Sequence, residues 1–564
     1  MRWIEYGAFL AIVIGLAGPV GVYLARVFQR QPTFLDPVLC PVEKVFHRWL
    51  RVRSDQEMSA RVYIASFLMF GASCSILLFL ILMLQRWLPG GPAGAYLTTP
   101  MTPDLAANTA VSFATTTTWQ AYSGENTLRY LTQLIGLVAQ NFLGAAAGLA
   151  AGIAFIRGIA RERFLTIGNF WVDLIRGLLW VLLPLALAGS VFLIWQGVPL
   201  NLDRYTVAHT LEGRAQIIAQ GPVAALEFIK NLGTNGGGFF NANGAHPYAN
   251  PTPLTNFLGL LAIAVLPASL MITFGRMTGR PAAGWVLLAV MVVLFTLGLV
   301  ACDFAETTAP PQLAGLHIFG GNMEGKEVRF GAGESVLTTI VTSSASTGSY
   351  NSLVDSYQPN GVLPPLIFML LGEVVFGGLG AGVYSVVMVA LLGAFLGGLM
   401  VGRTPEYLGK KIGGSETRWI ALYALVTPTV VLLLSGIAVA TAAGRAGLVT
   451  NAGARGFTEI LFAYASSVAN NGMNMAGLNA NTVFYNTTTA LAMLAGRYVS
   501  AAIALALAGR FAAQRRFLTT AGTLPSDTPM FGALVFATIV LLGALCFFPA
   551  LALGSFAELL QHAP

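Results

Sequence analysis

Ten apolar stretches divide this 564-residue chain, and each is long enough to cross a lipid bilayer. A helix needs about 20 residues to span a hydrocarbon core of about 30 Å. Because backbone polar groups must find partners within the bilayer, the sequence predicts an all-α polytopic membrane protein with about ten transmembrane helices. The stretches cover approximately residues 7–25, 63–84, 131–156, 177–195, 257–274, 284–302, 365–401, 420–442, 487–508 and 531–553.

Composition agrees with this prediction. The chain is 55% apolar and 10% charged, and its mean hydropathy is +0.71, which excludes a water-soluble globule. The net charge of +7 would point to nucleic acid in a soluble protein, but these basic residues lie in loops between apolar stretches. We therefore expect no nucleic-acid binding. The four cysteines lack CxxC spacing, so we expect neither a disulfide framework nor a metal site.

The loop charges predict the orientation of the chain in the membrane. Twenty lysines and arginines follow the odd-numbered stretches, whereas ten lie on the other side. Positively charged loops stay in the cytoplasm, so both termini are expected outside it. The first stretch has Glu5 in its flank and no clear cleavage site, and we interpret it as a retained helix.

Four segments rich in Gly, Ser, Thr and Asn recur on the outer side, ending at Gln120, Gly236, Gly348 and Gly472. The intervals are 116, 112 and 124 residues, and a short helical segment precedes each. A permeating cation exchanges its water shell for fixed oxygens, and small side chains let backbone carbonyls reach a shared axis. Close packing of small residues is the alternative, but it does not explain the spacing. We expect four pseudo-symmetric helix, pore loop, helix repeats around one ion pathway.

The predicted division of the chain follows from these repeats. Residues 1–62 form an N-terminal helix and cytoplasmic loop, 63–156 the first pore repeat, 177–274 the second, 284–401 the third with a broken second helix, 402–419 a cytoplasmic loop, 420–508 the fourth repeat and 531–553 a C-terminal helix. The candidate filter residues are Thr115, Thr116, Thr117, Thr118, Gln120, Asn231, Gly233, Thr234, Asn235, Gly236, Ser343, Ser344, Ser346, Thr347, Gly348, Ser467, Asn470, Asn471 and Gly472. K⁺ at this filter is the only metal expected.

Gln120 is the unusual member, because a bulky amide ends the first segment where the other three end in glycine. Its side-chain oxygen could line the ion path, which we favour, or the side chain could lean away and brace the filter. Two intramembrane charges, Glu373 and Arg497, could form a structural ion pair or take part in transport.

The seventh stretch is too long for one straight helix. Its glycines mark the expected break, which we interpret as a gate beneath the filter; a kinked packing helix is the alternative. The candidate gate and ion-exit residues are Glu373, Gly377, Gly378, Gly380 and Arg497.

Several long strings resemble a known family, the channel-like A subunits (KdpA) of bacterial Kdp potassium-importing ATPases, which are related to the Trk and Ktr potassium transporters. The likeness covers nearly the whole chain. It is carried by Asn108–Phe113, Trp119–Glu125, Leu232–Asn243, Asn322–Glu327, Gly372–Gly378 and Gly402–Ile412. Thr116 and Thr118 depart from the family pattern, which often has asparagines there.

The resemblance implies a non-catalytic subunit in a bacterial cytoplasmic (inner) membrane, which selects K⁺ outside and passes it sideways to a P-type ATPase subunit, KdpB. KdpC and the small KdpF would be accessory partners beside membrane lipid. The sequence has no GxxxxGK[ST] or Asp-Lys-Thr-Gly motif, so no nucleotide is expected on this chain. The resemblance also implies that the basic loop docks on the ATPase subunit through Arg403, Lys410 and Lys411.

Two rival functions remain open. A stand-alone K⁺ channel or Trk/Ktr-type cation symporter would share the filter, and co-purification of a P-type ATPase would decide against it. An intramembrane enzyme would need convergent catalytic groups, and the apolar stretches hold only the isolated Glu373 and Arg497.

Overall fold

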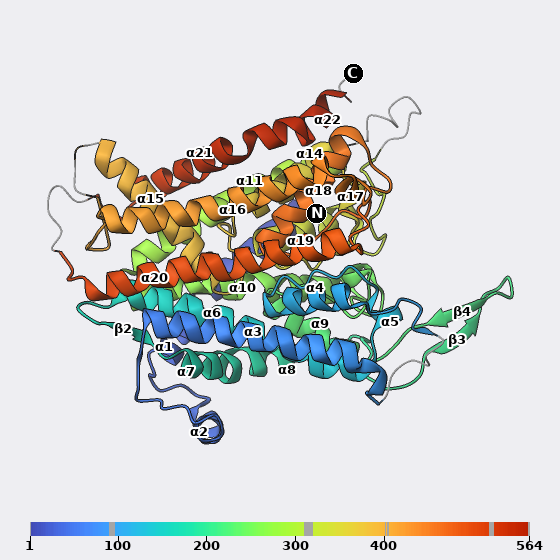
Figure 1. Ribbon diagram of the computed structural model, residues 1–564, viewed down its shortest axis with the longest axis horizontal. Helices are drawn as coiled ribbons and strands as arrows, with labels where there is room; N and C mark the ends of the chain where they lie inside the picture. The colour runs from blue at the N-terminus through green and yellow to red at the C-terminus, as the bar shows by residue number, and fades with distance from the viewer. Residues whose placement is uncertain are drawn as a thin grey trace.

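The computed structural model describes residues 2–89, 96–308, 320–400, 402, 405–517 and 524–561. Within these residues, ten helices are long and apolar enough to span a membrane, as the sequence predicts. They lie side by side along the long axis of the molecule (Figure 1). The ten spans are Arg2–Phe28 (α1), Ala60–Trp87 (α3, η1), Thr132–Ala160 (η3, α6), Phe170–Trp195 (α7, η4, α8), Pro253–Met277 (α10), Pro281–Thr307 (α11), Ala381–Met400 (α15), Gly414–Ala440 (α16), Val483–Ala513 (α19, η7, α20) and Pro529–Leu553 (α21).

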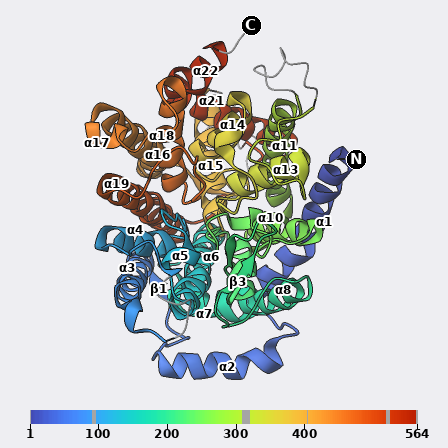
Figure 2. The same ribbon diagram turned by 90° about the vertical axis from the view of Figure 1, so that its right-hand side faces the viewer.

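Four shorter helices precede the four glycine- and amide-rich segments. They are α4 (Pro103–Ala114), α9 (Val223–Leu232), α13 (Gly331–Ser344) and α18 (Gly453–Val468). Each packs between spans: α4 contacts α3 and α19, α9 contacts α8 and α10, α13 contacts α11, and α18 contacts α16 and α19. Figure 2 shows α4, α13 and α18 at the end of the bundle that faces the viewer. We call these four the pore helices.

The seventh apolar stretch is broken, as its glycines predict. Helix α14 (Pro359–Leu370) ends before an irregular loop, 371–380, and α15 begins at Ala381. Gly377 and Gly380 have φ of 70° and 90°, a left-handed region that favours glycine. A Cβ at Gly380 would also overlap the carbonyl oxygen of Gly148 in α6. The loop therefore needs both the conformational freedom and the small size of glycine.

Three spans contain π-helical turns that the sequence analysis does not anticipate. These are η3 (Thr132–Val138), η4 (Gly177–Leu182) and η7 (Ala495–Val499). Such turns are often found at functional sites, and η7 contains Arg497.

The remaining elements lie at the ends of the bundle. Helix α2 (Asp36–Trp49) contacts α7 and is seen end on in Figure 1, across the direction of the spans. The short helical elements are α5 (Gly124–Thr127), η5 (Asn243–Ala245), η6 (Val354–Ser356), α17 (Ala442–Arg445) and α22 (Ser555–Gln561). Antiparallel pairs are formed by β1 (Met58–Ser59) with β2 (Thr166–Gly168), β3 (Thr206–His209) with β4 (Ala215–Ile218), and β5 (Glu406–Tyr407) with β6 (Lys410–Lys411).

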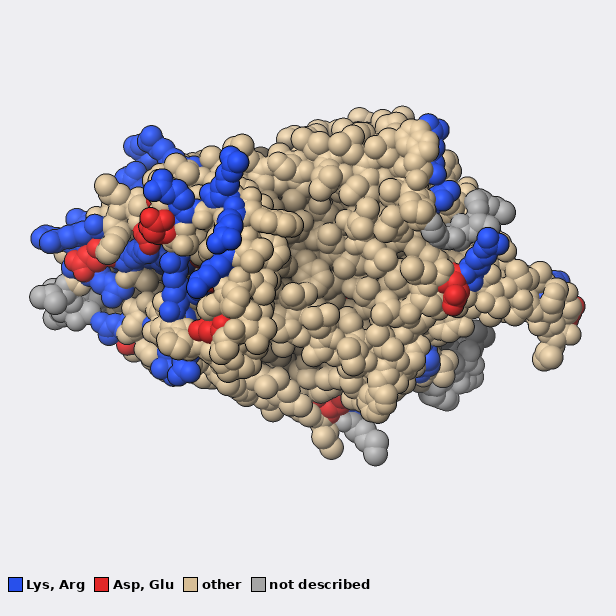
Figure 3. All heavy atoms as spheres, turned by 90° about the horizontal axis from the view of Figure 1, so that it is seen from below, with Lys and Arg blue, Asp and Glu red and all other residues tan. Residues whose placement is uncertain are grey.

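Charge is distributed unequally between the two ends. Lysines and arginines gather at the left-hand end in Figure 3, whereas the β3–β4 hairpin projects from the right-hand end in Figure 1. The C-terminal helix α22 also lies toward the right-hand end (Figure 1). This asymmetry is the one from which the sequence predicts orientation.

Candidate functional site

The four polar segments each begin where a pore helix ends. The helix C-caps are Thr115, Gly233, Ala345 and Ala469. A helix C-terminus carries a partial negative charge, so each pore helix directs its favourable end for a cation toward the segment that follows it. All four segments are buried within the bundle. We call the segments from these four residues to Gln120, Gly238, Gly348 and Gly472 the filter.

A backbone signature aligns the four filter segments. In each, two residues separated by one other residue have left-handed φ. This register makes Thr118 the equivalent of the three glycines, and it corrects the alignment that ends the first segment at Gln120. The left-handed pairs are Thr116 and Thr118 (62° and 49°), Thr234 and Gly236 (50° and 97°), Ser346 and Gly348 (47° and 77°), and Asn470 and Gly472 (49° and 92°).

The segments follow one another around a closed ring. A Cβ at Gly348 would overlap the carbonyl oxygen of Asn471 in the fourth segment. A Cβ at Gly472 would likewise overlap the carbonyl oxygen of Thr117 in the first. A Cβ at Gly236 would overlap the carbonyl oxygen of Thr347 in the third segment. Each glycine therefore leaves room for the carbonyl oxygen of the next segment. This close contact explains why three of the four segments have glycine at the same position.

Filter side chains mostly brace the ring instead of facing its axis. Asn471 Nδ2 donates to the carbonyl oxygen of Thr342 at 2.9 Å, and Asn235 Nδ2 donates to that of Asn141 at 3.1 Å. Asn470 Nδ2 donates to Thr117 Oγ1 at 2.8 Å. The amide nitrogens are thus engaged, so the oxygens left to meet a cation are the backbone carbonyls and, among the described residues, Asn235 Oδ1 and Asn470 Oδ1, which have no hydrogen-bond partner.

Four residues expected in the filter lie within the pore helices. The hydroxyls of Ser343, Ser344 and Ser467 donate to carbonyls of their own helices, at 3.2, 3.0 and 2.8 Å. Asn231 lies in the last turn of α9 and lines a cavity beside Gly259. The structure thus places these four side chains behind the filter.

Gln120 braces the junction between the first and second segments. Its side-chain oxygen accepts a hydrogen bond from Gly238 N at 3.0 Å. Its Nε2 donates to Gly238 O and to Tyr122 Oη, both at 3.2 Å. This geometry supports the bracing alternative over the favoured role in the ion path.

The broken helix lies directly against the filter. Leu379 N donates to Thr234 Oγ1 at 2.8 Å, and Gly377 N donates to Ser344 O at 3.0 Å. Glu373 folds back within the loop, where its Oε2 accepts a hydrogen bond from Gly378 N at 2.9 Å. The loop is therefore connected to the second filter segment and to the end of α13.

Glu373 and Arg497 do not form the direct ion pair considered from the sequence. Among the described residues, the salt bridges within 4.0 Å do not include this pair. The Arg497 guanidinium instead donates to the carbonyl oxygen of Gly144 at 3.2 Å and lies 4% exposed. The two residues lie near the same loop, since a Cβ at Gly148 would be 2.5 Å from Arg497 Nη2 and from Leu379 O.

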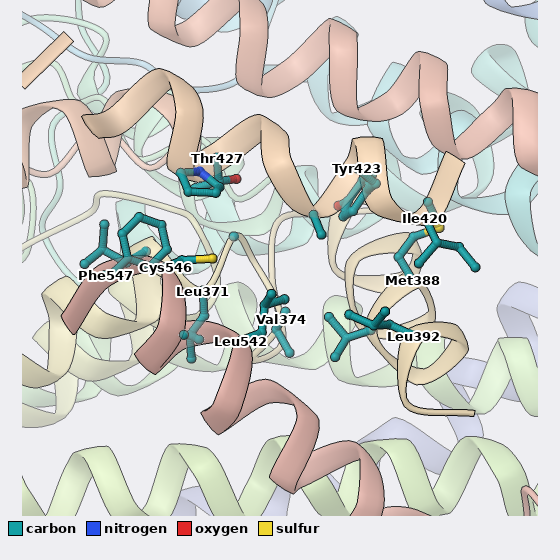
Figure 4. A pocket seen from close by; sticks show the side chains of 16 residues that line it. Leu371, Val374, Met388, Leu392, Ile420, Tyr423, Thr427, Leu542, Cys546 and Phe547 are labelled. Atoms are coloured by element: carbon teal, nitrogen blue, oxygen red, sulfur yellow. The ribbon is translucent and has the colours of Figure 1, made fainter. Parts of the chain in front are cut away.

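A cavity of about 50 Å³ lies beside the loop, on the side of α15, α16 and α21 (Figure 4). Leu371 and Val374, which flank Glu373 by one or two residues, line it together with Tyr423 and Thr427 of α16. A cavity of this size holds a few waters or one cation. It is lined by residues of α15, α16 and α21 as well as the loop.

The hairpin β5–β6 differs from the expectation for one residue proposed as a partner contact, Lys410. Lys410 is buried, and its Nζ donates to the carbonyl oxygens of Arg161, Phe511 and Gln514 at 2.6, 2.9 and 2.9 Å. Burial, with a smaller effect of Arg516, lowers the pKa of Lys410 to about 8. Lys410 thus ties helix ends together within the chain, whereas Lys411 is exposed. Arg403 lies outside the described residues.

A buried ion pair behind the second filter segment escapes the sequence analysis. Lys230 is 0% exposed, and its Nζ lies 2.6 Å from Glu227 Oε1 and donates to Asn243 Oδ1 at 2.6 Å. Charged residues in an otherwise apolar pore helix are the signal that could identify it.

Comparisons with known proteins agree with this architecture. The family described as "KdpA: Potassium-transporting ATPase A subunit" matches residues 7–560. The chain is 46% identical over 578 residues to a "Potassium-transporting ATPase potassium-binding subunit" of Acidobacterium capsulatum, covering 99% of this chain and 98% of that protein. A protein of the same name from Methylorubrum extorquens is 47% identical, with 99% and 97% covered. A ring of four pore segments and a match over nearly the full length together show that the chain belongs to the KdpA family of potassium-transporting ATPase A subunits.

Proposed function

We propose that this chain is the potassium-binding and translocating subunit of a high-affinity, ATP-driven K⁺ uptake complex. The closed ring of filter segments supports this function most directly. Four pore helices end at a common site where backbone carbonyls can replace the hydration shell of a cation. The relatives' printed names supply the identity of the cation, potassium.

The energy source lies in another chain of the complex. The relatives are named as subunits of an ATPase, and this sequence contains no phosphorylation or P-loop motif. The proposed partners are the P-type ATPase subunit KdpB and the accessory subunits KdpC and KdpF, with lipid around the spans. This chain itself binds K⁺, hydrolyses no ATP and binds no nucleotide.

K⁺ enters from outside the cell and leaves sideways toward KdpB. Basic residues gathered at one end support a multi-pass orientation in the bacterial cytoplasmic membrane, with both termini extracytoplasmic (Figure 3). The loop 371–380 closes the inner side of the filter, and the cavity between α15, α16 and α21 offers an exit (Figure 4). Glu373, whose carboxylate lies beside Gly378 next to the filter, attracts the cation as it leaves the ring. The division of the chain into four pore repeats, from 63–156 to 420–508, is part of the same proposal. So is the docking of Lys411 on the ATPase subunit.

The filter assignment is tested in the purified complex reconstituted into liposomes. A carboxylate and a Cβ at Gly236 or Gly472 would displace the neighbouring carbonyls of Thr347 or Thr117, so Gly236→Asp and Gly472→Asp should each weaken K⁺ affinity and reduce discrimination against Rb⁺ and Na⁺. The matched control is Gly213→Asp, at a left-handed glycine with open space around it. Wild-type selectivity in both filter variants would contradict the assignment.

A stand-alone channel would conduct K⁺ without a partner, so the same liposomes decide this alternative. The chain alone should hold K⁺ at the filter but show no steady conductance, because the loop 371–380 lies across the pathway. Steady conductance by the isolated chain would favour the channel.

A further inference from the structure

The first filter segment differs from the other three at the position where they have glycine. Gly236, Gly348 and Gly472 have no side chain, and a Cβ there would overlap a carbonyl oxygen of the next segment. Thr118 occupies the equivalent place with φ of 49°, and its side chain is 3% exposed. A β-branched residue in this left-handed region is unusual, so its retention at such a contact requires an explanation.

The Thr118 side chain bonds to the segment that it faces. Its Oγ1 donates a hydrogen bond to the carbonyl oxygen of Asn235 and accepts one from Gly237 N at 2.6 Å. Asn235 directly precedes Gly236, just as Thr347 directly precedes Gly348. The Asn235 carbonyl is therefore equivalent to the carbonyls of Thr347, Asn471 and Thr117, which Gly236, Gly348 and Gly472 face. At this junction the Thr118 hydroxyl thus forms a hydrogen bond with the carbonyl oxygen, where at the other three a glycine only leaves space for it.

The other three junctions lack this bond. Among the described residues, the carbonyl oxygens of Thr117, Thr347 and Asn471 accept no hydrogen bond from a side chain of the preceding segment. Of these four equivalent carbonyls in the described residues, that of Asn235 therefore accepts a side-chain donor from the preceding segment, and the other three do not.

The second segment is shaped to receive the first. A Cβ at Gly237 would lie 2.8 Å from both Cβ and O of Thr118 and 3.1 Å from Gln120 Oε1. Gly238 then meets the Gln120 amide through the two hydrogen bonds described above. The extra glycines of the second segment, Gly237 and Gly238, thus face the two bulky residues of the first, Thr118 and Gln120.

We infer that Thr118 is a specificity-determining positioning residue, whose hydroxyl fixes the Asn235 carbonyl and makes the cation-binding ring asymmetric. This inference rests on the proposed function, because it concerns the same filter. A carbonyl has two lone pairs, so Asn235 O can meet a cation while it accepts from Thr118. The bond limits its movement, and a ring that adapts less to ionic radius discriminates more between K⁺ and ions of other sizes.

The test compares threonine variants in the reconstituted complex, with apparent affinities for K⁺, Rb⁺ and Na⁺ as the readout. Thr118→Val keeps the shape of the side chain but removes the donor. We expect it to reduce discrimination between K⁺ and Rb⁺ by about tenfold, the factor that corresponds to one hydrogen bond of about 1.4 kcal/mol. Thr118→Ser restores the hydroxyl and should restore discrimination.

Matched variants separate this effect from general damage. Thr132→Val removes a buried hydroxyl that has no partner, and it should leave discrimination unchanged. Thr118→Ala and Thr118→Gly remove the donor with less bulk, and they provide the same test if the valine variant does not assemble. Wild-type K⁺ to Rb⁺ ratios in an assembled Thr118→Val, Ala or Gly complex would overturn the inference.

The result also distinguishes this inference from the proposed function. If Gly472→Asp alters selectivity and the threonine variants do not, the filter stands and the role of Thr118 is wrong. If neither set alters selectivity, the filter assignment itself fails.

Discussion

Asn243 donates a hydrogen bond of 2.7 Å from its Nδ2 to the carbonyl oxygen of Gly236, seven residues earlier in the chain. The same side chain accepts from buried Lys230 through its Oδ1. Lys230 is in turn paired with Glu227 one turn away in α9. A charged group that is otherwise surrounded by protein thus orients one amide, and that amide holds a filter carbonyl from behind.

Replacing Asn243 by alanine should weaken K⁺ binding by about tenfold. The Gly236 carbonyl would lose its donor and the Lys230 ammonium would lose an acceptor, a loss of roughly 1 to 2 kcal/mol. The measurement is the K⁺ concentration at half-maximal ATPase activity of the complex. Asn241→Ala, at an exposed neighbour in the same loop, is the control. Equal affinities for the two variants would exclude a role for Asn243 at the filter.

Lys326→Met should destabilise the end of the bundle at which α11 ends and α13 begins. Lys326 Nζ lies 2.7 Å from Glu306 Oε2, and both side chains are 0% exposed. Removing the cation leaves an uncompensated buried carboxylate, which costs about 3 kcal/mol or more. We expect a lower melting temperature of the purified complex, and a partial recovery when Glu306→Gln is added. A melting temperature equal to that of the wild type would contradict this assignment.

The spans could be predicted from sequence because twenty apolar residues in succession permit few other structures. Nine of the ten spans contain the predicted stretch to within two residues, and the tenth is broken where glycines cluster. The break was predictable because left-handed glycines such as Gly377 and Gly380 cannot continue a helix.

The register of the filter could not be predicted, because it depends on backbone conformation and not on residue type. Threonine rarely has positive φ, so the sequence pattern includes Thr118 in the filter but pairs Gln120 with the three glycines. Hydrogen bonds across the junction, from Thr118 to Asn235, compensate for that cost. A hydrogen bond between residues so far apart in the chain produces no recognisable pattern in the sequence around either residue.

The partners of charged residues are hard to predict for a related reason. Lys410 lies in a basic loop, which favours an exposed contact, yet three carbonyl oxygens at helix ends surround its ammonium group. Arg497 in η7 and Glu373 in the loop before α15 have opposite charges, yet each bonds to backbone. Partners on the backbone of another helix cannot be identified from the spacing of side chains.

Glu373→Gln should impair ATP-driven uptake more than it impairs K⁺ binding at the filter. Glutamine keeps an oxygen to accept the bond from Gly378 N, so the loop is retained while the negative charge is lost. The cation would then leave the filter without an attracting charge on its exit side. Equilibrium K⁺ binding and uptake are measured in parallel, with Glu324→Gln as a control outside the spans. Intact ATP-coupled uptake would exclude Glu373 from the exit.

Acid should destabilise the loop that carries His246, between α9 and α10. Its imidazole stacks on Phe240 with ring centroids 3.6 Å apart, and burial, with a smaller effect of Arg329, lowers its pKa to about 4. The unfolded chain therefore binds the proton between pH 6.5 and about 4 while the folded chain does not, so stability falls as pH decreases through this window. Above pH 6.5 both states are neutral and this contribution is constant.

The comparison of His246→Gln with the exposed control His209→Gln isolates this group. We expect the melting temperature of the wild-type complex, and of His209→Gln, to fall more between pH 7 and pH 4.5 than that of His246→Gln. The variant removes the titrating group but keeps a side chain of similar size, so the difference between the two slopes measures the proton excluded by the folded loop. Parallel slopes for all three proteins would mean that His246 is protonated in the folded chain, and that Arg329 and the aromatic stack do not exclude the charge.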